Sequence, residues 1–346
     1  MRTRFSVAFL LCSIAVAACG SPAEEPVSSV SQAGIICSFC RPEPITLASG
    51  IGPALCLTVD DANVYWGDEF GDVKSVPTGG GAVTTLATGQ GPVYGITYAY
   101  STISSPRPIF DLFEQLLWAG NAPDAMELVP KQSAPSAFVS GPQNPPAAVA
   151  VDSEHVYWTS PSVGAPGSGA VMMDSLHGGT PTLLSAATYP TALAVDATNV
   201  YWVDLASGTL TKKPLAGGPA VTLALVSPYT TSLALDSAAV PGENAVNAYW
   251  TETDTGSVKT VPVAGGATVT LASGSGTPYS VAADSTAIYW VNAEPVNGTV
   301  VKLSYGESTP ITLASNQDDP EFIALDSTNV YWVNFDTAGA LMKFAK

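Results

Sequence analysis

Short apolar segments recur along most of the chain, four to a unit. Residues 190–226 show one whole unit: PTALAVD, NVYWVD, GTLTKKPL and, after the turn AGGPA, VTLALV. Each segment is short, rich in β-branched or aromatic residues, and bounded by Asp, Gly or Pro. These features are typical of β-strands separated by tight turns. The pattern therefore predicts an all-β fold with four short strands in each unit.

One tryptophan marks each unit, at intervals of 40 to 52 residues. Six of the tryptophans follow a tyrosine, and the seventh follows Leu117. A period of this length with four strands is typical of a propeller blade, whose two faces only neighbouring blades can cover. We therefore predict a single seven-bladed β-propeller over residues 44–346, built from four-stranded antiparallel blades. The tryptophans are Trp66, Trp118, Trp158, Trp202, Trp250, Trp290 and Trp332.

The two ends of this region complement each other. The last unit ends at Lys346 after its third strand, whereas an unmatched segment, ITLAS at residues 45–49, precedes the first unit. The same five letters occur at residues 311–315, where a fourth strand is expected. We therefore expect the strand at residues 45–49 to join the last blade and close the ring, which removes exposed sheet edges.

At these tyrosine–tryptophan pairs the chain resembles the YWTD and NHL propeller repeats of extracellular and periplasmic proteins, and repeat-bearing bacterial lipoproteins of unknown role. The resemblance covers residues 45–346, and its nearest matches are YWTS at 157–160 and YWTE at 249–252. It implies the propeller architecture. Receptor propellers of the YWTD type have six blades where seven are counted here, so their ligand surfaces are not carried over.

The N-terminus has the organisation of an export signal. Residues 1–18 contain two arginines followed by an apolar run from Phe5 to Ala18, which is too short for a membrane-spanning helix. The following Cys19 completes a sequence that resembles the bacterial lipobox, which implies acylation of Cys19 and cleavage before it. The alternative is ordinary cleavage with Cys19 left as a free thiol. Residues 19–43 are then a lipidated cysteine and a flexible tether.

This resemblance implies a protein that is exported and anchored by lipid in the bacterial envelope. Gly20 stands where many lipoproteins retained in the inner membrane have Asp, so we expect the outer membrane, facing either the periplasm or the outside. The formal net charge is -17. An anionic surface repels nucleic acid and anionic lipid head groups, so charged partners are expected to be cationic or bridged by a metal.

Three further cysteines, Cys37, Cys40 and Cys56, do not indicate a metal site. Cys37 and Cys40 have CxxC spacing, but a lone pair cannot provide the four ligands of a structural zinc site. After export we expect a disulfide, either between these two or from one of them to Cys56.

Most repeated polar residues have structural explanations. An Asp follows the first strand in six units, where its carboxylate can accept bonds from the backbone of a turn; this interpretation is favoured over a ring of metal ligands. Tyrosine and tryptophan alternate along their strand, so they should pack between neighbouring blades. The six aspartates are Asp60, Asp152, Asp196, Asp236, Asp284 and Asp326.

No catalytic motif is present. His155 and His177 are the only histidines, and both lie in predicted turns. The chain resembles seven-bladed lyases of cyclic peptides in blade count alone. We therefore expect a non-enzymatic ligand- or protein-binding or scaffolding module, with no cofactor. The alternative is an envelope hydrolase or lyase with its site at the channel mouth.

Candidate binding residues lie where the repeat varies. At the face where the chain enters each first strand, an acidic and aromatic mouth suits a sugar, a peptide amine or calcium, although the sequence holds no calcium motif. The second unit carries an insertion at residues 99–115, which is either a loop that docks a partner or a cap on its own blade. The mouth candidates are Tyr229, Tyr279, Glu321, Asp68, Asp204 and Glu252, and the loop candidates are Arg107, Ile109, Phe110, Leu112 and Phe113.

Overall fold

The computed structural model describes residues 42–102, 112–120, 126–130, 136–139, 146–162, 167–177, 179–236, 246–274, 276–335 and 338–346. All regular elements in these ranges are β-strands, which confirms the prediction of an all-β propeller. Among them there is no helix long and apolar enough to cross a membrane. The leader, Cys19, Cys37 and Cys40 lie outside the described residues, so the predictions on them stay predictions.

The strands form seven four-stranded antiparallel sheets within the described ranges. From the inner to the outer strand, the first four sheets are β2(Ala54–Val59), β3(Asn63–Asp68), β4(Val73–Pro77), β5(Thr84–Ala87); β6(Val93–Thr102), β7(Leu112–Gly120), β8(Met126–Pro130), β9(Ser136–Val139); β10(Ala148–Val151), β11(His155–Ser160), β12(Gly169–Ser175), β13(Thr182–Ala187); and β14(Pro190–Val195), β15(Asn199–Asp204), β16(Thr209–Pro214), β17(Val221–Leu225). The other three are β18(Thr230–Leu235), β19(Asn247–Glu252), β20(Ser257–Pro262), β21(Val269–Ala272); β22(Pro278–Ala283), β23(Ala287–Asn292), β24(Gly298–Ser304), β25(Ile311–Gln317); and β26(Pro320–Leu325), β27(Asn329–Asn334), β28(Ala340–Ala345), β1(Ile45–Ser49).

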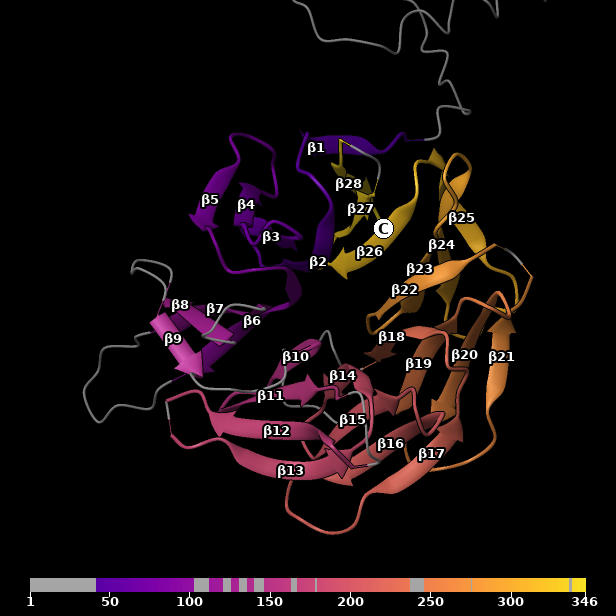
Figure 1. Ribbon diagram of the computed structural model, residues 1–346. Coiled ribbons are helices and arrows are strands. Elements are labelled where there is room, and N and C mark those ends of the chain that lie inside the picture. Colours follow the sequence, from indigo (N-terminus) through magenta and orange to yellow (C-terminus); the bar gives the residue numbers. More distant parts are fainter. Residues whose placement is uncertain are drawn as a thin grey trace, which may run out of the picture. The chain divides into compact units, whose positions relative to one another are not determined.

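The inner strands are arranged around a common axis (Figure 1). Each contacts the inner strand of the next sheet, in the order β2, β6, β10, β14, β18, β22 and β26, and β26 in turn contacts β2. Antiparallel pairing brings the start of each inner strand beside the end of the next strand, as in the pair Ala54 and Asp68. We call the side with these starts the mouth face. The other side, with the Asp turns and the turns after the third strands, is the reverse face.

Segment 45–49 forms β1, the outer strand of the sheet that also contains β26, β27 and β28. It runs antiparallel to β28, with Ile45 opposite Lys343 and Ser49 opposite Ala340. The connection that follows is tight, because Gly339 has a φ of 69° and a Cβ built there would lie 2.2 Å from the carbonyl oxygen of Gly52. Only glycine combines that backbone angle with so close an approach.

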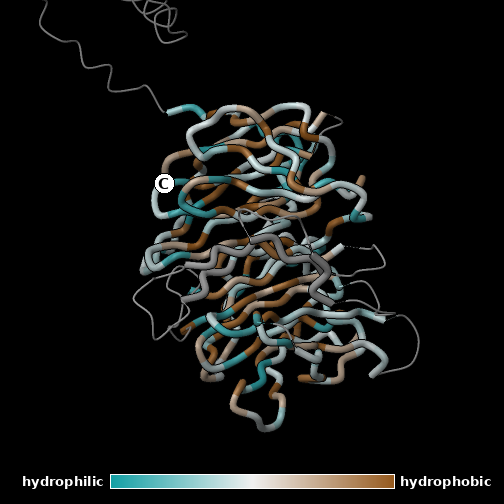
Figure 2. The backbone as a smooth tube through the Cα atoms, turned by 90° about the vertical axis from the view of Figure 1, so that its left-hand side faces the viewer, coloured by the Kyte–Doolittle hydropathy of each residue, from teal (hydrophilic) through white to brown (hydrophobic). Residues whose placement is uncertain are grey.

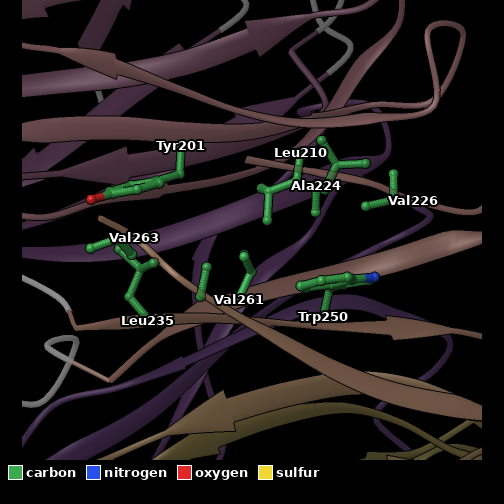
Figure 3. Packing of buried hydrophobic residues seen from close by; sticks show 10 residues of the cluster. Tyr201, Leu210, Ala224, Val226, Leu235, Trp250, Val261 and Val263 are labelled. Carbon is green, nitrogen blue, oxygen red and sulfur yellow. The ribbon is translucent and has the colours of Figure 1, made fainter. Parts of the chain in front are cut away.

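The core lies between the sheets, and one aromatic pair recurs in it. In the cluster of Figure 3, Tyr201 of β15 packs with Trp250 of β19, together with Leu210 and Val261. The same pairing of one sheet's tyrosine with the next sheet's tryptophan occurs around the ring, and it includes Tyr331 with Trp66. In the remaining interface Leu117 replaces the tyrosine beside Trp158. The predicted packing role of the tyrosine–tryptophan pairs is therefore confirmed, and Figure 2 shows the hydrophobic stretches that run along the strands.

The aspartate that follows six of the seven inner strands organises a turn, as predicted. In the first sheet, Oδ1 of Asp60 accepts hydrogen bonds from the backbone amides of Ala62 and Asn63, at 2.7 and 2.6 Å. Its Oδ2 accepts a bond from the hydroxyl of Tyr65 at 2.8 Å. The carboxylate therefore ties the turn to the tyrosine that fills the interface between sheets. Asp152, Asp196 and Asp326 make the same bond to Tyr157, Tyr201 and Tyr331.

The prediction of an inserted loop in the second sheet is corrected by the structure. Residues 99–115 were expected to form one inserted loop, but β6 continues to Thr102 and β7 begins at Leu112, with these two residues paired. Both ends of the insertion therefore lengthen a hairpin, because alternating residues such as those of AYST suit a strand. Leu112 and Phe113 lie in β7, whereas Arg107, Ile109 and Phe110 lie outside the described residues.

Candidate functional site

A β-bulge near the start of the inner strands sets which side chains reach the mouth. In β22, for example, Pro278 pairs with Asn292 and Ser280 with Val291, so Tyr279 is the extra residue. A bulge re-aims the side chain that it carries. The extra residue is Leu55 in β2, Tyr94 in β6 and Thr231 in β18. In β14 and β26 the shift lies between Pro190 and Leu193 and between Pro320 and Ile323, where Thr191 and Glu321 follow the proline as Tyr279 does. β10 has no shift in its described pairs, and Ala147 precedes the first of them.

This register corrects the alignment of the mouth residues. Counting from the proline before each inner strand made Tyr229 the equivalent of Tyr279, but Thr230 is the residue that pairs in the position of Pro278. Tyr229 instead lies in the connection before β18, where 61% of it is exposed. Tyr94, which the sequence count did not identify, takes the bulge position in β6. A bulge that shifts the register by one or two residues cannot be recognised from the order of apolar residues. The spacing from the preceding proline therefore could not place these side chains.

Three of the predicted mouth acids bond within the propeller. Asp68 is fully buried, and its carboxylate accepts bonds from the backbone amides of Phe70 and Asp72 and from the ammonium of Lys74, the last at 2.8 Å. Asp204 is also buried and accepts bonds from the amides of Thr188 and Tyr189, at 2.7 and 3.0 Å. Both carboxylates therefore hold the turns of the mouth face.

Glu252 is similarly engaged. Its side chain accepts bonds from the indole of Trp250 at 3.0 Å and from the ammonium of Lys259 at 2.6 Å. Burial disfavours its charge, but these bonds and Lys259 outweigh that effect and lower the pKa of Glu252. Glu252 therefore stays ionised and locked in position.

Tyr279 and Glu321 lie close to each other on adjacent inner strands. The ring of Tyr279 meets that of Phe322 edge to face, with centroids 5.8 Å apart. Burial and the neighbouring Asp319 raise the pKa of Glu321 to about 7. Burial, together with Glu321 and Asp319, raises the pKa of Tyr279 as well. Of the predicted mouth residues, these two are the pair that the fold brings together.

A third acidic residue belongs to the same corner. Asp319, in the turn before β26, adopts a φ of 51°, and its amide donates to the carbonyl of Glu294 at 3.0 Å. Burial, Asp318 and Glu294 raise the pKa of Asp319. The sequence showed these acids, but only the fold shows that they gather beside Tyr279.

The basic side chains in the described ranges are all lysines, and most have partners inside the propeller. Lys74, Lys259 and Lys346 form ion pairs with Asp68, Glu252 and Asp284. Lys212 and Lys343 donate to backbone carbonyls, and Lys302 lies over the ring of Tyr289. The mouth-face acids Asp319 and Glu321 have no ion pair within the described part of the chain.

Large exposed apolar side chains occur on both faces, and five of them lie on the mouth face. Besides Tyr229, Phe70 and Val296 lie in turns on this face and are 68% and 72% exposed. Leu225, at the mouth end of β17, is 79% exposed, and Tyr94 is 44% exposed. On the reverse face, among the residues described, Val246 and Tyr305 lie in turns, and six more exposed apolar side chains lie at the starts of outer strands: Ile45, Val83, Leu183, Val221, Val269 and Ile311. The mouth face is therefore both acidic and apolar.

The reverse face holds both histidines. His155 begins β11, with its Nδ1 3.6 Å from Oδ1 of Asp152, and His177 lies in the turn after β12, with its Nε2 3.8 Å from Oε2 of Glu154. The mouth face therefore has no imidazole to serve as an acid or base. Within the described ranges, no group of three or more His, Cys, Asp or Glu side chains could hold a metal ion.

Cys56 is a free buried thiol in the described part of the chain. Its Sγ lies 3.3 Å from the carbonyl oxygen of Val93, which belongs to the next sheet. Burial raises the pKa of the thiol to about 12. Cys56 therefore acts as a small packing residue between two sheets. Its pairing with Cys37 or Cys40 stays a prediction, because those two residues lie outside the described ranges.

The chain is similar in structure to a chain in the crystal structure of a nidogen/laminin complex, with 18% sequence identity and a TM-score of 0.48. The alignment covers 72% of this chain and 93% of that chain. No protein-family model matches the sequence. No curated protein matches it either.

Proposed function

We propose that this propeller is a non-enzymatic protein-binding module that uses its mouth face. The observation that carries the proposal is that exposed Phe70, Tyr229 and Val296 lie in turns of that face, together with Leu225 and the acids beside Tyr279. Contiguous exposed apolar groups mark interaction surfaces, and aromatic residues contribute much of the binding energy in protein interfaces. A wide, rigid rim of turns is also better suited to a protein surface than to a small molecule.

The charge of this face specifies the kind of partner. Its lysines neutralise Asp68 and Glu252, whereas several other acids of this face, Asp319 and Glu321 among them, have no ion pair in the described ranges. A partner segment with basic and apolar side chains complements such a surface. Binding should therefore weaken as salt increases, because the exposed charges are screened.

A peptide array tests the mouth face directly. The soluble propeller, residues 42–346, is applied to an array of basic–apolar, acidic and neutral peptides, with glycans on the same slide. We expect binding to the basic–apolar peptides, and a loss of at least about tenfold when Leu225→Ser and Val296→Ser are combined. Val246→Ser is the matched control, because it removes an exposed valine from the reverse face. Binding to glycans alone, or equal losses for both variants, contradicts the proposal.

We also propose that the propeller is exported and held on the bacterial outer membrane by lipid on Cys19. The support is the resemblance of residues 16–19 to the lipobox and the polar segment that follows. In the propeller, Ile45 lies at the reverse-face end of β1, where it pairs with Lys343. The first strand of the propeller therefore begins on the side away from the proposed binding surface.

Lipid attachment has a simple test. Cells that express the whole chain are fed an alkyne-labelled palmitate, and the protein is isolated and coupled to a fluorophore. We expect strong labelling of the natural chain and none of Cys19→Ala, since the acyl chain is carried by that thiol. Cys37→Ala is the control and should label normally. Labelling of Cys19→Ala at the natural level contradicts the assignment.

A further inference from the structure

The corner of the mouth face formed by β22 and β26 combines two aromatic rings with acidic groups. Tyr279 and Glu321 occupy the same bulge position on neighbouring inner strands. The corresponding residues in the other sheets with such a shift are Leu55, Tyr94, Thr191 and Thr231, so Glu321 is the one carboxylate among them.

The backbone fixes the aromatic part of this corner. The carbonyl of Tyr279 accepts hydrogen bonds from the hydroxyls of Thr231 and Thr251, the latter at 3.0 Å, so the neighbouring sheet holds the start of β22 in place. Edge-to-face contact with Phe322 then restrains the tyrosine ring. Preorganised aromatic side chains bind with a small loss of conformational entropy.

The carboxylates beside these rings lack a counter-charge. Lysine partners compensate Asp68 and Glu252 elsewhere on the rim, at 2.8 and 2.6 Å. Glu321 and Asp319 have no such ion pair among the described residues, and they repel each other's charge, which contributes to the raised pKa of Glu321. A cation placed between the carboxylates and the tyrosine ring would gain both Coulomb and cation–π attraction.

We infer that Tyr279, Phe322, Glu321 and Asp319 form a subsite for one lysine or arginine side chain of a protein partner. This inference rests on the proposed function and adds to it the chemistry of one anchor residue. Its occupant is a cationic side chain rather than a metal ion, because no three carboxylates in the described ranges are placed to hold a metal. The aliphatic part of the partner's lysine or arginine side chain packs along the rings of Tyr279 and Phe322, while its charged group faces the carboxylates of Glu321 and Asp319.

The subsite makes binding depend on pH. Glu321 has a pKa of about 7 in the free protein, raised by burial and by Asp319. A bound cation stabilises the ionised form, so binding lowers that pKa and releases a proton. Affinity should therefore be highest above pH 7 and fall as the pH is lowered toward 5. The other titratable groups near this corner are Asp318, Asp319, Glu294 and Tyr279.

The test uses a fluorescein-labelled decapeptide of alternating lysine and leucine with residues 42–346, measured by fluorescence anisotropy between pH 5 and pH 8. For Glu321→Gln we expect about a tenfold weaker Kd at pH 8, which corresponds to about 1.4 kcal/mol, and a flattened pH profile. Glu307→Gln removes the same charge from an exposed turn on the reverse face and should change neither. Tyr279→Leu should weaken binding without flattening the pH profile.

The outcomes separate this inference from the proposed function. If the peptide binds, depends on Leu225 and Val296, and is indifferent to Glu321→Gln, the subsite is wrong while the mouth face remains the binding surface. Equal losses for Glu321→Gln and Glu307→Gln would also overturn the subsite, since they indicate attraction by net charge alone. If neither this peptide nor any on the array binds, the proposed function itself fails.

Discussion

Removing β1 is expected to destabilise the whole propeller. A chain that begins at Gly50 loses the hydrogen bonds between β1 and β28 and the burial of Leu47 and Ala48 against Tyr331 and Leu341. The loss should exceed about 3 kcal/mol, from buried apolar area and lost hydrogen bonds together. It also leaves β28 as an uncovered edge, which favours pairing between chains. Urea unfolding and size-exclusion chromatography should show a lower midpoint and oligomers.

The control for this truncation is a chain that begins at Pro42, which retains β1 and should unfold like the longer protein. A single substitution at the same closure is also informative. Gly339→Ala places a Cβ against the carbonyl of Gly52 at a φ of 69°, so it should lower the midpoint although every strand is present. A truncated chain that stays monomeric with an unchanged midpoint would show that β1 is not needed for closure.

Truncating one interface tryptophan should have an effect of similar size. Trp250 is fully buried between two sheets, and its indole donates to Glu252, so Trp250→Ala creates a cavity and removes a partner of a buried carboxylate. We expect a loss of about 3–5 kcal/mol in the free energy of unfolding. Tyr229→Ala, at an exposed aromatic residue, should change it by less than about 0.5 kcal/mol.

A finer comparison isolates the hydrogen bond. Trp66 is as buried as Trp250, but its indole nitrogen has no hydrogen-bond partner. Trp250→Phe should therefore cost more than Trp66→Phe, by about 1.5 to 3 kcal/mol for the bond to a charged acceptor. If both substitutions lower the free energy of unfolding equally, lost packing explains the effect and the hydrogen bond to Glu252 contributes nothing measurable.

The strands could be located from the sequence because one short pattern is repeated. Most units contain a strand rich in β-branched residues, a tyrosine–tryptophan pair and a Gly turn. These local features favour the same four-stranded sheet that packing between sheets requires, and such consistency specifies a fold. The Asp turns were predictable for the same reason, since Asp60 and its equivalents make local bonds. The strand ends of the second unit were harder to predict, because its hairpin extends to Thr102 and Leu112 and the other units have no matching segment there.

The site was less accessible to sequence reasoning. Asp68, Asp204 and Glu252 looked like available mouth acids, but a sequence does not show which carboxylates bond to a nearby amide or lysine. Tyr279 and Glu321 were found because they vary at one position of the repeat. Asp319 and Phe322 were missed because their proximity depends on contacts between two sheets and on the bulges at the starts of the inner strands.

The partnership of β1 with β28 also governs the order of events during synthesis. Almost 300 residues separate Ile45 from Lys343, so the first strand to leave the ribosome waits for the last one before it can pair. Contacts of such separation form late, because the loop entropy must be overcome first. The nascent chain therefore exposes β1 unpaired until β28 has been synthesised, and a chain terminated before β28 is a substrate for chaperones and proteases rather than a smaller propeller.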